Sequence, residues 1–133
     1  MRSELNDSPY LSIAAGNGML AVILGAFGAH ALRARLDDRA LGIYETAVQD
    51  HFAHSLALLA VGRLYRSAVS PRLLGFAGFA FSLGLVLFSG SLYLLSVTGI
   101  RWLGAITPLG GLAFIAGWSL LLAWSLGPGR DRS

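Results

Sequence analysis

Residues 40–66, ALGIYETAVQDHFAHSLALLAVGRLYR, decide how many times the chain crosses a membrane. Their uncharged part, from His51 to Gly62, has 12 residues. As a helix it would measure about 18 Å, which is too short for a hydrocarbon core of about 30 Å. The helical spacing of apolar residues nevertheless continues back through Tyr44 and Asp50. We therefore predict one helix over about 40–66, which carries ionisable side chains into the membrane.

The rest of the chain is poor in charge. Apolar residue types make up 55% of the 133 residues and charged types 13%, and the mean hydropathy is +0.64. Runs without Asp, Glu, Lys or Arg cover 8–32, 73–100 and 102–129, and each exceeds the roughly 20 residues that a membrane-spanning helix needs. This composition excludes a disordered chain, an ordinary soluble enzyme and, since cysteine is absent, a disulfide scaffold. The sequence predicts an integral membrane protein.

We predict an all-α fold, namely a polytopic membrane protein of one domain, 1–133, built as a four-transmembrane-helix bundle. Serine followed by proline suits a helix start, because the hydroxyl caps the helix and proline needs no partner for an N–H; Ser8-Pro9 and Ser70-Pro71 fit this pattern. Thr107-Pro108 either starts the last helix or kinks it; because apolar residues precede it, we favour a kink in a helix that begins at about Trp102. The predicted helices span about 9–32, 40–66, 71–98 and 102–126.

Four spans place both termini on one side of the membrane. Arginine is the only basic residue type, and ten arginines are divided unequally between the two sides. The terminal side would carry Arg2, Arg63, Arg66, Arg72, Arg130 and Arg132, and the other side Arg33, Arg35, Arg39 and Arg101. The positive-inside rule then favours cytoplasmic termini. Because these charges are spread thinly over helix ends, the net charge of +3 indicates lipid headgroups as contacts and no nucleic acid as a partner.

Small residues recur at spacings of three and four in three of the predicted helices. Lipid tails are as apolar as leucine, so helices in a membrane associate through close contact, which small side chains allow. A period near 3.5 is typical of the seam of a left-handed bundle. The seams are Ala14, Gly18, Ala21, Gly25 and Gly28; Gly75, Gly78, Ser82, Leu85, Ser89, Leu92 and Ser96; and Gly110, Ala113, Gly117, Leu120 and Trp124.

Five ionisable residues form a candidate intramembrane polar cluster: His30, Glu45, Asp50, His51 and His54. Ionisable groups inside a membrane are costly and are therefore functional candidates. Asp50, His51 and His54 share one helix face through spacings of three and four. His30 closes the first helix on the side where the second begins, so we expect the cluster near that end of the bundle. We also expect the Asp50 carboxylate to pair with a histidine, because an unpaired buried charge is expensive.

The sequence gives no catalytic residue, no metal site and no cofactor with any specificity. It lacks a phosphate-binding loop, a dinucleotide fingerprint, a Cys-x-x-Cys motif and a His-Glu-x-x-His motif. Ser89-Gly90-Ser91 lies inside a predicted helix and does not have the surroundings of a catalytic serine. We expect both hydroxyls to bond back to carbonyl groups of their own helix.

Four motifs in order resemble the YgdD-like family of small four-helix bacterial membrane proteins, a domain-of-unknown-function family with eukaryotic transmembrane relatives. The resemblance covers about residues 10–126 and implies a multi-pass protein of the bacterial cytoplasmic (inner) membrane without an established activity. His30 and His54 fall on histidines of the family pattern, whereas Asp50-His51 stands where relatives more often have Tyr-Gln. The motifs are 25–30 (GAFGAH), 45–59 (ETAVQ leading to HSLALL), 87–93 (LFSGSLY) and 107–118 (TPLGGLAFIAGW).

The leading functional hypothesis is a non-enzymatic structural or accessory subunit that packs through its small-residue seams, either as a homo-oligomer or in a larger membrane complex. In this reading the polar cluster ties the first hairpin together by hydrogen bonds. One alternative is an oligomeric conduit or carrier for protons, ions or a small solute, lined by Asp50, His51 and His54. A second alternative is b-type haem or metal binding by His30 and His54.

Overall fold

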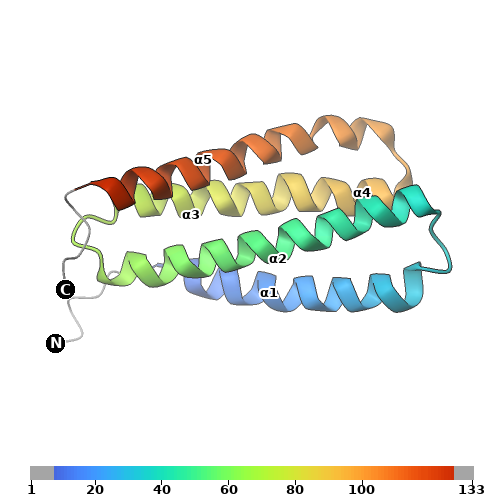
Figure 1. Cartoon of the computed structure of the whole chain (residues 1–133), viewed down its shortest axis with the longest axis horizontal. Coiled ribbons are helices and arrows are strands. Elements are labelled where there is room, and N and C mark those ends of the chain that lie inside the picture. The colour runs from blue at the N-terminus through green and yellow to red at the C-terminus, as the bar shows by residue number, and fades with distance from the viewer. Residues whose placement is uncertain (1–7, 128–133) are drawn as a thin grey trace.

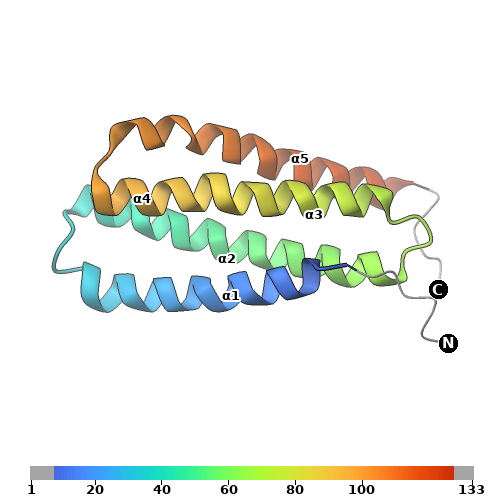
Figure 2. The ribbon, with the colours of Figure 1, turned by 180° about the vertical axis from the view of Figure 1, so that it is seen from behind.

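The computed structural model describes residues 8–127, and those residues form helices and no strand (Figure 1). Four antiparallel rods lie side by side, and the first and last described residues are at the same end of the bundle (Figures 1 and 2). The predicted four-helix bundle is confirmed. The rods are α1 (Tyr10–Phe27) with the π-helical turn η2 (Gly28–Leu32); α2 (Asp38–Ser67); α3 (Arg72–Gly84), the π-helical turn η3 (Leu85–Ser89) and α4 (Gly90–Thr98); and the 3₁₀ turn η4 (Arg101–Ala105) followed by α5 (Thr107–Leu126).

Short polar side chains and one glycine define several of the helix ends. The Ser8 hydroxyl accepts a hydrogen bond from the Tyr10 amide at 3.2 Å. The Asp37 carboxylate accepts one from the Ala40 amide at 2.7 Å, which caps α2. Gly99 ends α4 in the left-handed region, with φ at 69°, a conformation that glycine adopts without strain.

Pro108 does not kink the last helix, so the kink predicted there is wrong. The segment before it is a 3₁₀ turn, and the α-helix starts at Thr107 with Pro108 in its first turn. At that position the missing N–H of proline would have no partner within the helix in any case. The last rod therefore changes from 3₁₀ to α geometry at the proline.

The helices pack as two pairs joined by α2. α1 lies along α2, α5 lies along α3, and α2 also contacts α3 and α4. α1 and α5 are consequently at opposite edges of the bundle (Figures 1 and 2). α2 therefore has neighbours on both sides, α1 on one and α3 and α4 on the other.

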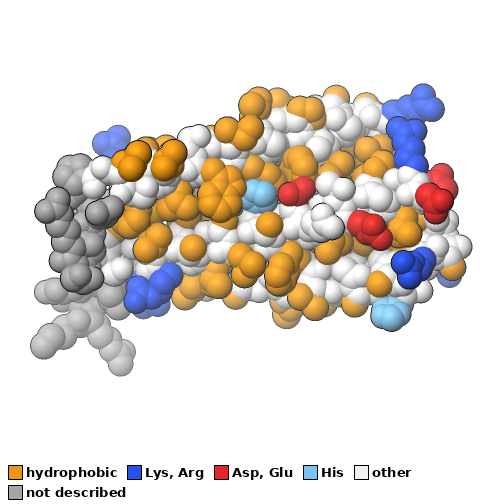
Figure 3. Space-filling view, viewed as in Figure 1, with side chains coloured by type: hydrophobic (Ala, Val, Ile, Leu, Met, Phe, Trp, Pro, Cys, Tyr) orange, Lys and Arg blue, Asp and Glu red, His pale blue; other side chains and the backbone are white. Residues whose placement is uncertain are grey.

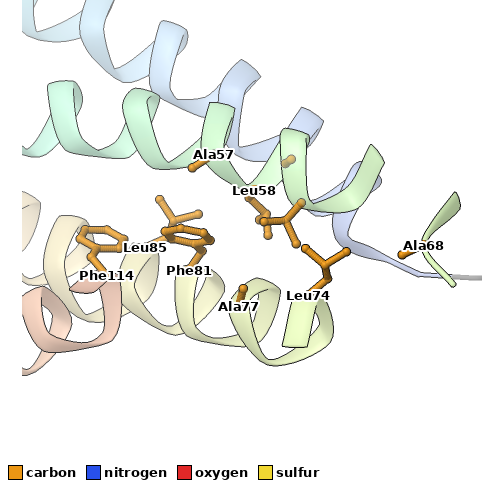
Figure 4. Packing of buried hydrophobic residues seen from close by; sticks show 10 residues of the cluster. Ala57, Leu58, Ala68, Leu74, Ala77, Phe81, Leu85 and Phe114 are labelled. Carbon is orange, nitrogen blue, oxygen red and sulfur yellow. The ribbon is translucent and has the colours of Figure 1, made fainter. Parts of the chain in front are cut away.

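The apolar core lies where α2, α3 and α5 meet (Figure 4). Leu58 of α2 and Leu74 and Phe81 of α3 have exposed fractions of 0%. Glycine lets the helices approach at this core, since a Cβ added at Gly117 would lie 2.8 Å from the Phe81 ring. Gly62 lets α1 approach in the same way, because an added Cβ there would lie 2.8 Å from the backbone nitrogen of Leu11.

The seams predicted from small residues face the interior. In each seam several members are buried, and the others are at least half-buried in the structure. The buried members are Ala14, Ala21 and Gly28 on the first rod, Gly78, Leu85, Ser89 and Ser96 on the third, and Gly110 and Gly117 on the last. The large apolar side chains between the seam positions point outward, for example Met19, Val86 and Leu122, which are 65%, 68% and 60% exposed.

Three of the four rods, residues 10–32, 72–98 and 101–126, are long and apolar enough to cross a membrane. α2 is less apolar, but its 30 residues measure about 45 Å as a helix, and it runs alongside the other rods along the length of the bundle (Figure 1). Helices that pack side by side in this way cross together, so the structure is a four-span membrane bundle.

Replacing Gly110 by alanine is expected to destabilise the bundle. An added Cβ would lie 2.7 Å from the backbone Cα of Phe88, and a backbone atom inside a packed helix pair cannot easily move. We expect a loss of about 1–3 kcal/mol, measured as a lower midpoint of SDS-induced unfolding in detergent micelles. Gly16→Ala is the matched control, because a Cβ there meets nothing within 4 Å. Equal midpoints for the two variants would contradict the close approach of α5 and η3.

Candidate functional site

The polar residues of α2 lie at the middle of the bundle and not near its end as predicted. α2 begins at Asp38, so Asp50 follows after about 18 Å of helix. Asp50, His51 and His54 all lie within about 4 Å of the helix midpoint along its axis. The predicted bounds, about 40–66, have nearly the same midpoint as α2, so the prediction placed the cluster too close to the headgroups because it did not count the polar first turns as part of the span.

His51 is the buried member of this group of α2 residues, with 4% of its surface exposed. Its Nδ1 lies 2.9 Å from the Tyr93 hydroxyl of α4, and its Nε2 lies 3.0 Å from Oδ1 of Asn17 in α1. Asn17 in turn donates from Nδ2 to the backbone oxygen of Ile13 at 2.9 Å. The His51 side chain of α2 therefore connects α1 and α4 by hydrogen bonds.

The direction of each bond in this chain follows from the carbonyl group at its end. A backbone carbonyl can only accept, so the nitrogen of Asn17 faces Ile13 and its oxygen faces His51. The proton of His51 is then on Nε2, and Nδ1 accepts from the hydroxyl of Tyr93. His51 is thereby a neutral imidazole with both nitrogens satisfied, which suits a position inside hydrocarbon.

In His54 the two ring nitrogens have the opposite roles to those in His51: Nδ1 is the donor and Nε2 the acceptor. Its Nδ1 donates to the backbone oxygen of Asp50 at 2.9 Å, so Nε2 accepts from the indole N–H of Trp118 at 3.1 Å. The ring also stacks on Phe114, with centroids 3.6 Å apart and planes at 8°. His54 is therefore held by two residues of α5, and neither nitrogen has a lone pair free for a ligand.

Neither carboxylate of the cluster takes part in these hydrogen bonds. Asp50 contacts His54 through its backbone oxygen, so the predicted pairing of its carboxylate with a histidine is not formed. Glu45 is exposed and Asp50 is half-buried. Within residues 8–127 no group of three or more His, Asp, Glu or Cys side chains is placed to hold a metal ion.

His30 is separate from the other histidines. It is exposed in η2 at the end of the first rod, where the preceding Gly28 lies against Tyr44. His51 faces Asn17 instead, and the 13 residues from Asn17 to His30 measure about 20 Å along the helix. Figure 3 likewise shows the histidine colour at two distant places on one face. The structure therefore does not bring His30 and His54 together as a pair of ligands.

Three partners of these histidines were not predicted from the sequence: Asn17, Tyr93 and Trp118. Asn17 could have been found, because it is the one side-chain amide in an otherwise apolar run. Tyr93 and Trp118 gave no such signal, since an aromatic residue in a membrane helix is ordinarily a packing residue. Side chains of α1, α2, α4 and α5 therefore build one polar layer, which consists of Asn17, His51, His54, Tyr93 and Trp118. Only its members on α2 were predicted from the sequence.

These features define a class of protein: a small polytopic helical membrane protein with a polar layer at the level of its core. The chain belongs to the family described as "Protein of unknown function (DUF423)", whose family model matches residues 24–111. This confirms the predicted family of small bacterial membrane proteins and the absence of an established activity. The match takes in all of α2, α3 and α4, and therefore most of the polar layer.

Curated relatives cover most of the chain. It is 47% identical over 113 residues to the UPF0382 membrane protein YwdK of Bacillus subtilis, which is 85% of this chain and 92% of that protein. It is 47% identical over 104 residues to the UPF0382 membrane protein SH2409 of Staphylococcus haemolyticus, covering 78% and 84% of the two chains. The UPF0382 membrane protein SERP0230 of Staphylococcus epidermidis is 43% identical over 117 residues, 88% and 94%. No solved structure matches the chain.

His51 and His54 are expected to show opposite neutral tautomers. His51 should carry its proton on Nε2 and His54 on Nδ1, because their hydrogen-bond partners differ. Long-range proton–nitrogen correlation NMR of the imidazole rings distinguishes the two forms. Trp118→Phe removes the donor to Nε2 of His54 and should disturb the spectrum of His54 alone. Identical tautomers, or an effect of Trp118→Phe on His51, would contradict the two hydrogen-bond chains.

Proposed function

We propose that the chain is a non-enzymatic structural or accessory subunit that assembles within the membrane, with a second copy of itself as its partner. The observation that carries this proposal is the outward face of α2. Glu45, Thr46 and Gln49 are exposed on that face, with Asp50 at its edge. The face continues with small and apolar residues, Ala53, Leu56 and Ala60, which are exposed as well.

The depth of these polar side chains makes their exposure costly. Glu45 lies about 11 Å and Asp50 about 4 Å from the midpoint of α2 along its axis, within the roughly 15 Å half-thickness of a hydrocarbon core. An acidic side chain that faces lipid at the centre of a span costs about 2.5–3.5 kcal/mol on insertion scales. Within residues 8–127 no hydrogen bond or ion pair occupies the side chains of Glu45, Gln49 or Asp50. A protein surface over this face would remove that cost.

The neighbouring groove favours a second copy as that surface. It has a volume of about 250 Å³ and lies between the end of α1 and the start of α2. Small residues on one wall, Gly25 and Ala29, allow close approach of another helix. Arg33 and Glu45 line the same groove, so two copies related by a two-fold axis can pair the arginine of one with the glutamate of the other.

We also infer that the protein lies in the bacterial cytoplasmic (inner) membrane with cytoplasmic termini. A helical architecture supports this membrane, since spans of the outer membrane are β-barrels. Six arginines on the terminal side against four on the other support the orientation. Arg2, Arg130 and Arg132 of that count lie outside the described residues. Arg63, Arg66 and Arg72 are at the terminal end of the bundle in the structure.

Disulfide cross-linking tests the partner, and the chain offers a clean background because it has no cysteine. Gln49→Cys on the outward face of α2 should give a disulfide-linked dimer in native membranes under mild oxidation. Ile115→Cys is the control, since Ile115 is 62% exposed on α5, away from that face. A dimer from both variants, or from neither, would overturn the proposal. A cross-link of Gln49→Cys to a different protein would replace the second copy by a larger complex.

Reporter fusions test the orientation. Alkaline phosphatase fused after the last residue should be inactive, whereas a fluorescent protein at the same place should fluoresce, because the proposed C-terminus is cytoplasmic. Alkaline phosphatase inserted after Arg35, in the turn before α2, should be active and serves as the matched control. The inverse pattern would show that the arginine count does not set the orientation.

A further inference from the structure

The buried serines of the third rod are closed to ligands. Ser91 donates to the Phe88 carbonyl at 3.0 Å, as expected from the sequence. The same expectation is wrong for Ser89, whose hydroxyl has no hydrogen-bond partner within the described residues. Ser89 is only 1% exposed, so a molecule at the surface of the bundle does not reach it.

A groove with two arginines lies at the end of the bundle away from the first and last described residues. It has a volume of about 240 Å³ and lies between the first turns of α2 and the turn that joins α4 to η4. Arg39 lines it from α2 and Arg101 from η4, and both residues are exposed. Figure 3 shows basic side chains at this end of the bundle. The groove therefore carries two permanent positive charges, because arginine stays protonated in proteins.

The two arginines are not neutralised by the protein itself. Within residues 8–127 neither guanidinium group has a hydrogen bond or an ion pair. Asp37 also lines the groove, but its carboxylate accepts a hydrogen bond from the Ala40 amide at 2.7 Å and does not pair with an arginine. With two positive groups and one negative group, the lining keeps a net positive charge. The groove therefore attracts an anion.

The arginines lie at the depth of the lipid headgroups. Arg39 is about 20 Å from the midpoint of α2 along the helix axis, and the headgroup region extends from about 15 to about 22 Å from the bilayer midplane. Arg101 begins the last rod on the same side of the bundle. Trp102 follows it and is 65% exposed, and tryptophan is enriched at membrane interfaces. Both guanidinium groups are therefore at the level of phospholipid phosphates.

The part of the groove nearer the hydrocarbon is apolar. Ile43 lies one turn further into the membrane than Arg39, about 14 Å from the midpoint of α2. Leu95, about one turn before the end of α4, lines the groove from the other helix. Both side chains are thus near the boundary of the hydrocarbon core. The groove has its charge and its apolar surface in the same order along the membrane normal as a phospholipid molecule.

We propose that this groove binds one anionic phospholipid, with its phosphate between Arg39 and Arg101. The start of its acyl chains then lies against Ile43 and Leu95. Each guanidinium group presents its N–H donors in a planar fork that matches two oxygens of a phosphate. A zwitterionic lipid has the same phosphate, but its ammonium group is repelled by the arginines, so the charge of the groove selects a headgroup such as phosphatidylglycerol. Free phosphate shares the charge but has no chain for the apolar part of the groove.

This inference does not depend on the proposed assembly. The proposed contact between copies uses Arg33, Glu45 and Gln49, which line a different groove, and none of them lines the lipid groove. Loss of lipid selectivity would leave the disulfide cross-linking result unchanged, and the reverse also holds. The two proposals can therefore fail separately.

The test measures which phospholipid lies beside the groove in nanodiscs that contain the full chain. Ile100 lies between two lining residues, Gly99 and Arg101, and is 42% exposed. A small fluorophore on Ile100→Cys therefore reports on this place, and the chain has no other cysteine. In a phosphatidylcholine bilayer, spin-labelled phosphatidylglycerol should quench the fluorophore at an about tenfold lower mole fraction than spin-labelled phosphatidylcholine. Millimolar inorganic phosphate should not reverse this quenching.

Charge variants identify the residues that select the lipid. Arg39→Gln and Arg101→Gln should each lower the preference for phosphatidylglycerol about fivefold, and both should fold normally because the side chains are exposed. Arg35→Gln is the matched control, since Arg35 is exposed at the same end of the bundle and does not line the groove. Asp37→Asn should raise the preference about two- to fivefold, because asparagine also caps a helix and the opposing charge is removed.

A second fluorophore position shows that the effect is local. Leu126 is 78% exposed at the other end of the last rod, so quenching at Leu126→Cys should not change in Arg39→Gln or Arg101→Gln. Equal quenching by the two phospholipids at Ile100→Cys would overturn the proposal. An equal loss of preference in Arg35→Gln would replace the groove by a diffuse charge effect, and reversal by inorganic phosphate would replace the lipid by a free anion; either result would also overturn it.

Discussion

The absence of water from the bilayer core is the constraint on which the rest of this structure depends. A polar group there must find its partner inside the protein, because hydrocarbon offers none. α2 brings His51 and His54 to the middle of the bundle, so its neighbours must supply partners for them at the same depth. Asn17, Tyr93 and Trp118 are those partners. The three hydrogen bonds also fix how far α1, α4 and α5 can slide along α2, so they set the register of the bundle.

Most of the fold could be predicted from the sequence, because charge and small residues follow simple rules in a membrane. Three uncharged runs gave three spans, and the helical spacing around Asp50 gave the fourth. The seams could also be predicted, since residues such as Gly117 and Gly110 must be small where another helix touches. The change from 3₁₀ to α geometry at Pro108 could not be predicted from the sequence, because proline is equally compatible with a kink inside a helix and with the first turn of a new helix.

The candidate site was harder to predict than the fold. A sequence shows which residues share a helix face, but it does not show how deep in the membrane that face lies. Asp50, His51 and His54 share a face only broadly, and in the structure they turn towards three different surroundings. His51 meets α1 and α4, His54 meets α5, and Asp50 contacts His54 through its backbone oxygen alone. The hairpin between the first two helices brings His30 near the start of α2. His54, however, lies more than four helical turns further along α2.

The chemistry at position 51 reconciles this structure with the family resemblance. The resemblance implies that relatives more often have glutamine at that position, where this chain has histidine. A glutamine amide, however, donates from its nitrogen and accepts at its oxygen, as a neutral imidazole does from its two nitrogens. Either residue can accept from Tyr93 and donate to Asn17. In this chain the centre of α2 holds one donor and one acceptor between two helices, and a neutral His51 supplies both.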